Sequence, residues 1–405
     1  MKKLSLLIVF FCISILLNAQ ESKNKNVASF KLGSGLNFSF NEGDYQFNFS
    51  GFIQPSYINS KVKGAYADHV FSAKRSFLII GGKAVKEKVS FLIQTDYSLS
   101  EPLLDAWVAY HATDKITISV GQKQTFLNNR EMTFREDKLQ FTDRSLLSQN
   151  LSRTGREFGL FIESMFGNQF GIAPMFALTS GDGRNSLGSD SRDTDLGGMK
   201  IGGRLDLYPL GYFSEGNDGL SVDLAHEESL KFVFGAAISK NTGVSNAVGE
   251  GHGNFFLYNA NGLNNLPDYS QVYIDFLMKY NGFSFLGEYA NASTSGLNVT
   301  YLDASATQIL APQQISEFLV IGDSYNFQLG YVTKKGLSFD MRYESATPEF
   351  ESNLNSLLTD TNSLTFGLTK YFNNNNLKMQ AAITSINASN GNDQTIGEFL
   401  VQIIF

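Results

Sequence analysis

The chain has 405 residues, and its 39 Asp and Glu outnumber its 32 Lys and Arg, which gives a formal net charge of −7. This acidic balance excludes a nucleic-acid-binding protein, because contact with phosphates requires a basic surface. The composition, with 35 Phe, 17 Tyr and 37 Gly but only 7 Pro, favours an all-β chain over a helical one.

The N-terminus carries the three-part pattern of a secretory signal peptide. Lys2 and Lys3 precede a mostly apolar run, and the run ends near a small residue, Ala19, at a plausible cleavage point. The apolar run is too short to span a bilayer as a helix. We expect a signal peptide at 1–19, export through the Sec pathway, and a periplasmic lead-in at 20–42.

Apolar and polar side chains alternate with period two through the rest of the chain. Between 45 and 57, one face carries Tyr45, Phe47, Phe49 and Ile53, while most of the intervening residues are polar. This alternation predicts a strand with one apolar and one polar face. The same pattern predicts strands at 91–97, 116–121, 272–279, 337–344 and 377–384.

The predicted apolar faces carry no charge, which favours a membrane barrel over a soluble sandwich, because a basic residue facing lipid costs roughly 2–4 kcal/mol near the bilayer midplane. No segment after the signal peptide has the run of about 18 or more apolar residues that a membrane helix needs. A closed barrel is the other structure that satisfies every backbone polar group in lipid. We therefore predict a transmembrane antiparallel β-barrel over 43–405.

The connections between about sixteen predicted strands fall into two alternating classes. The short class comprises 85–88, 112–115, 167–168, 281–282, 334–336 and 373–376. The long class comprises about 58–70, 125–155, 181–195, 240–268, 292–322 and 346–362. Short periplasmic turns opposite long extracellular loops are typical of outer-membrane barrels. One connection, about 211–228, is long although it lies on the short side.

The chain ends in an alternating apolar segment whose last residue is Phe405. This ending resembles the signal that the bacterial barrel-assembly machinery reads on a closing strand. A barrel of sixteen strands leaves an aqueous lumen, whereas the interior of an eight-stranded barrel is filled by side chains. The sequence therefore predicts an outer-membrane porin that allows passive diffusion of small solutes.

The motifs of enzymes are absent from the sequence. It has no Gly-x-Ser-x-Gly elbow and no phosphate-binding loop, and Leu230 stands where a zinc-protease helix beginning at His226 would need a second histidine. The four histidines are scattered, and the acidic run at 181–195 does not match a calcium-binding loop, which makes a solvated outer loop the better interpretation. We expect no catalytic residue, metal or cofactor.

Positive charge is concentrated around the long connection at 125–155. A structureless connection of that length is commonly functional, and we predict that it folds into the lumen and narrows it. The basic residues proposed to line an anion path are Lys74, Arg75, Lys123, Arg130, Arg135, Lys138, Arg144, Arg153 and Arg156.

Between about 70 and 165 the chain resembles the phosphate-selective porins O and P of the bacterial outer membrane, in the branch found in Bacteroidetes. The segments that carry this resemblance are Lys74-Arg75-Ser76-Phe77, Gln94-Thr95-Asp96-Tyr97-Ser98, Leu103-Leu104-Asp105-Ala106-Trp107-Val108, Val120-Gly121-Gln122, Leu139-Gln140-Phe141-Thr142-Asp143-Arg144-Ser145 and Gly155-Arg156-Glu157-Phe158-Gly159. The resemblance implies a sixteen-stranded barrel, usually a homotrimer, whose basic side chains line a path for anions such as phosphate.

Carried over by motif, Lys74 and Arg75 match paired arginines of the family, and Arg144 and Arg156 match basic positions near its inner loop. The chain departs from the family at Lys123, which comes one position earlier than the usual lysine. One position changes the face of a strand. By the alternation of the preceding residues, Lys123 should nevertheless point into the lumen.

Three other interpretations stay open. The segment from Lys123 to Glu157 holds seven basic and five acidic residues, so its charges could form internal salt bridges within a non-selective porin. A plugged barrel could act as a surface adhesin or receptor through 240–268 and 292–322. A barrel lipase would need a Ser, His and polar partner that the sequence does not show. The expected partners are outer-membrane lipid and lipopolysaccharide, the assembly machinery and small anionic solutes.

Overall fold

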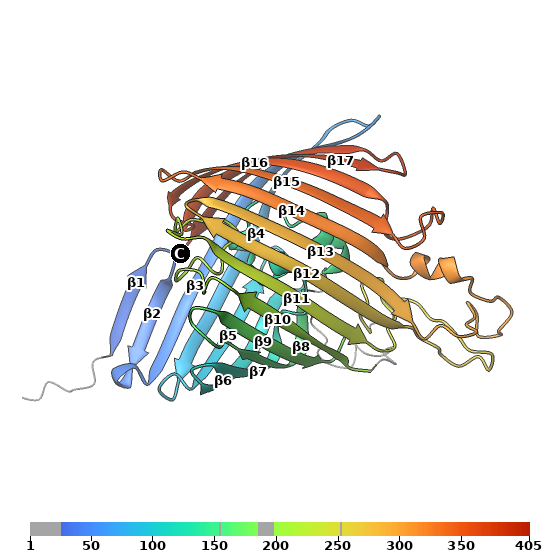
Figure 1. Ribbon diagram of the computed structural model, residues 1–405, viewed down its shortest axis with the longest axis horizontal. Coiled ribbons are helices and arrows are strands. Elements are labelled where there is room, and N and C mark those ends of the chain that lie inside the picture. The colour runs from blue at the N-terminus through green and yellow to red at the C-terminus, as the bar shows by residue number, and fades with distance from the viewer. Residues whose placement is uncertain (1–25, 154, 185–197, 252) are drawn as a thin grey trace, which may run out of the picture.

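The computed structural model describes residues 26–153, 155–184, 198–251 and 253–405. The predicted signal peptide at 1–19 and most of the acidic run at 181–195 lie outside the described residues. Sixteen strands, β3 to β18, form a closed antiparallel barrel in which each strand pairs with the next along the chain (Figure 1). The barrel closes where β18 pairs with β3, from Gln394 opposite Val62 to Ile404 opposite Phe52.

The strands of the barrel are β3 (Tyr45–Val62), β4 (Asp68–Ala84), β5 (Val89–Asp96), β6 (Leu103–Thr113), β7 (Ile116–Gln124), β8 (Arg156–Ser164), β9 (Gly171–Thr179), β10 (Lys200–Tyr208), β11 (Lys231–Asn241), β12 (Asp268–Tyr280), β13 (Phe283–Ser295), β14 (Gly322–Val332), β15 (Leu337–Pro348), β16 (Thr361–Asn373), β17 (Leu377–Ala388) and β18 (Gln394–Ile404). The predicted sixteen-stranded barrel is therefore confirmed.

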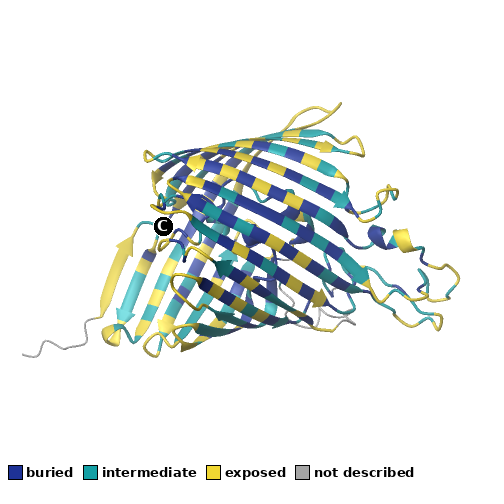
Figure 2. Ribbon diagram, viewed as in Figure 1, coloured by how far each residue is buried: buried dark blue, intermediate teal, exposed yellow. Residues whose placement is uncertain are grey.

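The two faces of the strands differ in polarity as the alternation predicts. On β14, Tyr325 and Phe327 are exposed on the outside, whereas Ser324, Asn326 and Gln328 are buried toward the inside. Figure 2 shows the same alternation as bands of exposed and buried residues along most strands. An apolar outer face and a polar inner face are the opposite of a soluble barrel, and they fit a barrel surrounded by lipid.

The C-terminal part of the lead-in expected at 20–42 forms a hairpin that the sequence analysis did not predict. Strands β1 (Val27–Lys31) and β2 (Gly35–Phe40) precede a short 3₁₀ turn, η1 (Asn41–Gly43). Strand β2 pairs with the first residues of β3, from Phe49 back to Tyr45, below the point where β18 begins to pair with the rest of β3. The hairpin therefore extends the sheet past the C-terminal end of β18 and is not part of the closed ring (Figure 1).

Most long and short connections lie at opposite ends of the barrel, as predicted, and the connection between Tyr208 and Lys231 is the long exception on the short side. The loop at 125–155 begins after Gln124 and ends before Arg156, at the boundaries of β7 and β8. The prediction of a long loop at 58–70 was wrong, because β3 continues to Val62 and β4 begins at Asp68. The extra strand length follows from continued pairing of β3 with both β4 and β18 in this region.

Three extracellular connections fold together over one side of the mouth. They are the residues between β11 and β12, between β13 and β14, which include a 3₁₀ helix η4 (Pro312–Glu317), and between β15 and β16. Their apolar side chains, among them Val244, Leu257 and Ile315, form one hydrophobic cluster with the inner wall of β11 to β13. Of the described helices, none is long and apolar enough to cross a membrane.

Candidate functional site: a lumenal loop and its ion pairs

The connection between β7 and β8 lies inside the barrel and contains three short helical elements. They are η2 (Arg130–Thr133), η3 (Glu136–Lys138) and α2 (Leu146–Leu151). Ser145 caps α2 by accepting a hydrogen bond from the Ser148 N–H, which satisfies one of the free amides at a helix start. Leu147 and Leu151, one helical turn apart, are buried in the hydrophobic cluster on the wall. The helix is therefore fixed on one side of the lumen.

A buried group of two arginines and two aspartates ties the start of the loop to the wall. Arg130 Nε donates to Asp275 Oδ1 at 2.7 Å and Arg130 Nη2 to Asp206 Oδ1 at 2.9 Å. Arg204 bridges the same carboxylates, at 2.8 Å to Asp206 and 2.7 Å to Asp275. We call these four residues the anchor quartet. Gly235 lies between the two aspartates on the neighbouring strands, and a Cβ there would come within 2.5 Å of Arg204, Arg130 and Asp206.

Carboxylates also hold the middle of the loop. The Glu131 N–H donates to Glu288 on β13 at 2.7 Å. The Glu131 side chain in turn accepts hydrogen bonds from the hydroxyls of Ser145 and Ser148, at 2.7 and 2.6 Å, and from the Gln328 amide at 2.7 Å. These contacts connect η2, the start of α2 and the wall. They leave no acidic oxygen of Glu131 for a passing solute.

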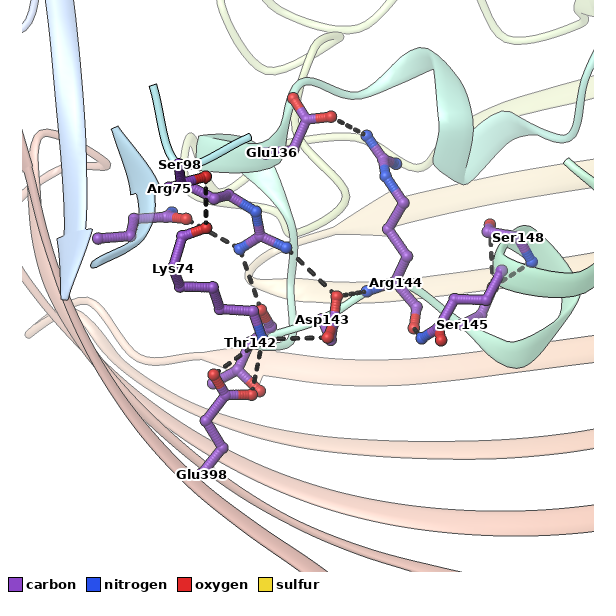
Figure 3. Close-up of polar contacts among 12 residues, drawn as sticks. Lys74, Arg75, Ser98, Glu136, Thr142, Asp143, Arg144, Ser145, Ser148 and Glu398 are labelled. Carbon is purple, nitrogen blue, oxygen red and sulfur yellow. Dashed lines mark hydrogen bonds and ion pairs between the residues drawn. The ribbon is translucent and has the colours of Figure 1, made fainter. Parts of the chain in front are cut away.

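Lys74 and Arg75 of β4 converge on a single acid of the loop, Asp143 (Figure 3). Lys74 Nζ lies 3.0 Å from Asp143 and 2.8 Å from Glu398 of β18, and Arg75 Nη2 lies 3.3 Å from Asp143. Burial raises the pKa of the Asp143 carboxyl, but Lys74 and Arg75 lower it more, so that the net pKa lies below its ordinary value. Arg75 also donates to Gln54 at 2.8 Å.

Arg144 and Arg156 meet at another acid of the loop, Glu136. Arg144 Nη2 donates to Glu136 Oε1 at 3.1 Å, and Arg156 Nη1 donates to the same oxygen at 3.5 Å. Arg156 is also held by Asp105 on β6, at 3.2 Å from its Nε. Burial raises the pKa of the Glu136 carboxyl, but the charges of Arg156, Arg144 and Arg75 outweigh it and hold that pKa well below its ordinary range.

The other basic candidates are distributed around these contacts. Lys123 Nζ lies 2.5 Å from Glu163 and 3.4 Å from the buried Ser119 Oγ, which places its amine on the lumenal side. Arg135 is ion-paired with Asp137. Lys138 has no ion pair within the described residues, and burial lowers its pKa.

Arg153 is exposed, and it too has no ion pair among the residues that the structure describes. Seven of the nine basic candidates are therefore neutralised by neighbouring acids.

Three cavities adjoin the loop, and we name them by position. The vestibule, on the extracellular side, has a volume of about 810 Å³ and is lined by Arg144, Arg153, Arg156, Arg184, Glu136 and other residues. The exit cavity, of about 460 Å³, is lined by Arg135, Asp137, Lys138 and the turn at 374–376 on the periplasmic side. The side cavity, of about 410 Å³, lies against Thr133, Phe134 and Glu163.

Sequence reasoning missed the partners of the basic residues on the distant wall. Asp206, Asp275 and Glu288 stand at inward positions of their strands, and their place on polar faces was the available signal. It also missed the way in which the connection after β10 enters the barrel. There Lys279 donates to the Asn217 and Leu220 carbonyls, and Phe213 packs on Phe134 and Leu139 of the loop.

No group of three or more His, Cys, Asp or Glu side chains among the described residues could hold a metal ion.

No family model and no curated protein matches the sequence.

Solved structures do match the fold. An anion-selective porin from Comamonas acidovorans has a TM-score of 0.56 at 9% identity, with 89% of this chain and 100% of that chain covered. The outer-membrane channel DcaP of Acinetobacter baumannii has a TM-score of 0.54 at 10% identity, with 90% and 99% covered. A trimer form of in-vitro folded OmpT, an outer-membrane protein of Vibrio cholerae, has a TM-score of 0.51 at 9% identity, with 89% and 99% covered.

These likenesses establish the fold as that of outer-membrane β-barrels. Together with the apolar outer face, the fold places this chain in the bacterial outer membrane.

Proposed function

We propose that this protein is a porin that allows passive diffusion of small hydrophilic solutes across the outer membrane. The observation that carries this proposal is a closed barrel with a polar inner face, in which an inward loop separates cavities at the extracellular and periplasmic ends. Sixteen strands enclose more space than side chains alone fill. The loop narrows this space, and we assign the constriction to 125–155.

We further propose that the pore prefers small anions, with phosphate as a solute to test. Four arginines line the vestibule, and one of them, Arg153, has no acidic partner among the described residues. Guanidinium groups offer forked donors that replace part of the hydration of a phosphate or carboxylate. The resemblance to phosphate-selective porins between about 70 and 165 points in the same direction. The Comamonas porin is described as anion-selective, which supports the same preference.

A non-selective general porin is the second candidate function. The observation that favours it is the pairing of Lys74, Arg75, Arg144 and Arg156 with acids, which removes most of the net positive charge along the inner wall. A paired cation attracts a passing anion less than a free one, since the neighbouring carboxylate repels the anion. The two candidates differ in selectivity and not in architecture.

The remaining assignments belong to the same proposal. We propose no enzymatic activity, because the sequence carries none of the catalytic motifs that were sought. A homotrimer is supported by the trimer form of the Vibrio cholerae protein. We also propose that lipid and lipopolysaccharide surround the barrel and that the assembly machinery reads the strand ending at Phe405.

Single-channel recording of the refolded protein in a planar bilayer tests this function. We expect discrete conductance steps, a reversal potential that indicates anion preference under a salt gradient, and a block by added phosphate that Arg153→Ala weakens. Conductance without anion preference would support the general porin. Absence of conductance in protein shown to be folded would contradict both candidates and favour an adhesin or receptor.

A further inference from the structure

Consecutive residues of the loop face different cavities. Glu136 lines the vestibule, whereas Arg135 and Asp137 on either side of it line the exit cavity. Thr133 and Phe134, a few residues earlier, line the side cavity. The segment around η3 is therefore a partition between the extracellular and periplasmic spaces. In the proposed channel, a solute that moves from the vestibule to the exit cavity would pass this segment.

Glu136 is the acid at this partition, and its contacts balance two cations. One oxygen, Oε1, accepts from both Arg144 and Arg156, and the other, Oε2, is buried with no hydrogen-bond partner. The side chains of Glu136, Arg144 and Arg156 are 13%, 11% and 7% exposed. The group thus sits at the floor of the vestibule.

The local charge balance depends on two acids that occupy different places. Arg144 and Arg156 contribute two positive charges, and Glu136 and Asp105 contribute two negative charges. Asp105 is buried in the wall at β6, where Gln94 and the Gln124 N–H hold it at 3.0 and 2.9 Å. Of these two acids, Glu136 alone is among the residues that line the vestibule.

We propose that Glu136 is the residue that determines the charge selectivity of the channel, because it neutralises Arg144 and Arg156 at the partition between the vestibule and the exit cavity. This inference rests on the proposed channel function. A neutral side chain at position 136 would leave Arg144 and Arg156 with one acidic partner, in a narrow space where charges are less screened than in bulk water. Uncompensated charge in a cleft concentrates ions of the opposite sign.

The test compares Glu136→Gln with the wild-type protein by reversal potential in a potassium chloride gradient. Glutamine keeps the size and the accepting oxygen, so the hydrogen bonds to Arg144 and Arg156 can persist while the charge is lost. We expect the anion-to-cation permeability ratio to rise by at least about twofold. The matched control is Glu163→Gln, which removes the same charge beside Lys123 at the side cavity and should change the ratio much less.

Labelling separates the effect of charge from an effect on loop folding. Cys12 is the only cysteine in the sequence and lies within the expected signal peptide, so Glu136→Cys introduces a unique thiol into the exported chain. A negatively charged methanethiosulfonate reagent should return the permeability ratio toward the wild-type value, and a positively charged one should raise it further.

Four results would contradict the proposal. The permeability ratio could stay unchanged in Glu136→Gln while the wild-type protein conducts. It could also be the same with the negatively and the positively charged reagent on fully labelled Glu136→Cys. A larger shift in Glu163→Gln would place the path through the side cavity. Absence of conductance in the wild-type protein would overturn the channel function itself, and this inference with it.

Discussion

Charge pairs in the lumen have very different degrees of burial, and the anchor quartet is at the buried extreme. The side chains of Arg204 and Asp275 are fully buried, and those of Arg130 and Asp206 are 7% exposed. Removing one partner from such a group leaves a charge without compensation in a region of low dielectric constant. The cost of that change exceeds the net gain from forming the pair.

We therefore expect Asp275→Asn to lower the free energy of unfolding by about 3–5 kcal/mol. The measurement is urea-induced unfolding of the barrel in lipid vesicles, followed by tryptophan and tyrosine fluorescence. Asp393→Asn is the control, because Asp393 pairs with Lys63 at the surface, where solvent screens the charges. Equal destabilisation by the two substitutions would show that burial of the quartet does not determine its energetics.

The ion pairs of Glu136 and Asp143 with nearby cations persist in moderate acid. The pKa values of Glu136 and Asp143 are lowered in the folded protein by nearby arginines and Lys74, against the opposing effect of burial. Their stabilising contribution is therefore present above the carboxyl pKa of the unfolded chain, about 4. It is lost only as the pH falls through the lower pKa of the folded state.

We expect the difference in selectivity between the wild-type protein and Glu136→Gln to stay constant from about pH 8 to about pH 5 and to disappear only as the pH falls below about 4. Recording at stepped pH on both sides of the bilayer checks this expectation. A transition near neutral pH that persists in Glu136→Gln would mean that another group controls the loop.

At the scale of elements, α2 holds the second half of the loop against the wall. Its buried leucines, Leu147 and Leu151, pack in one cluster with small wall residues. These include Ala237, Ala290 and Ala292, which are at most 1% exposed. Small side chains on a barrel wall leave the space into which a helix can dock. Apolar packing therefore fixes α2 against the wall formed by β11 to β13.

We expect Leu147→Ala to create a cavity in this cluster and to lower the stability of the docked loop by about 2–5 kcal/mol. The loop should then fluctuate more, which would appear as increased open-channel current noise and a lower midpoint of thermal unfolding. Asn150→Ala on the same helix is the control, since Asn150 is partly buried and outside the cluster. Unchanged noise in Leu147→Ala would show that other contacts suffice to hold the loop.

The strands could be predicted from the sequence, whereas most contacts between distant strands and the loop could not. Period-two alternation located the strands because one face meets lipid and the other water, so that the pattern repeats along each strand. The same pattern is weak in Val27–Lys31, and the N-terminal hairpin was not predicted. The partner of Arg130 could not be read from sequence spacing, because Asp275 is 145 positions away and only the closed barrel brings the two together.

At the scale of the whole molecule, the barrel interior is divided into a packed side and an open side. The hydrophobic cluster beneath the extracellular connections fills the mouth above β11 to β13, and a second cluster, with Phe134 and Phe213, fills the periplasmic side of the same wall. The vestibule lies between residues 246–254 of the connection after β11 and the opposite residues of β8 and of the connection after β5. An off-axis path of this kind would admit solutes by size through a space much smaller than the barrel itself.

The β3–β18 seam that closes the barrel and the N-terminal hairpin pair with different residues of β3. Strand β18 pairs with β3 from Phe52 onward, whereas β2 pairs only with the preceding residues of β3. Removing 26–44 should therefore leave sixteen strands, a closed ring and a wild-type conductance. Removing 394–405 should instead expose the unpaired edges of β17 and β3, and such edges promote aggregation.

Heat-modified gel mobility and single-channel conductance of the two truncated chains, refolded side by side, distinguish these outcomes. If the β3–β18 seam alone closes the barrel, the chain without 26–44 should give a conducting, heat-modifiable barrel. The chain without 394–405 should then give only aggregate. Loss of folding in both would mean that the hairpin is needed for closure. The seam could then form only after β2 had paired with β3, because the first residues of β3 have no partner other than β2 and β4.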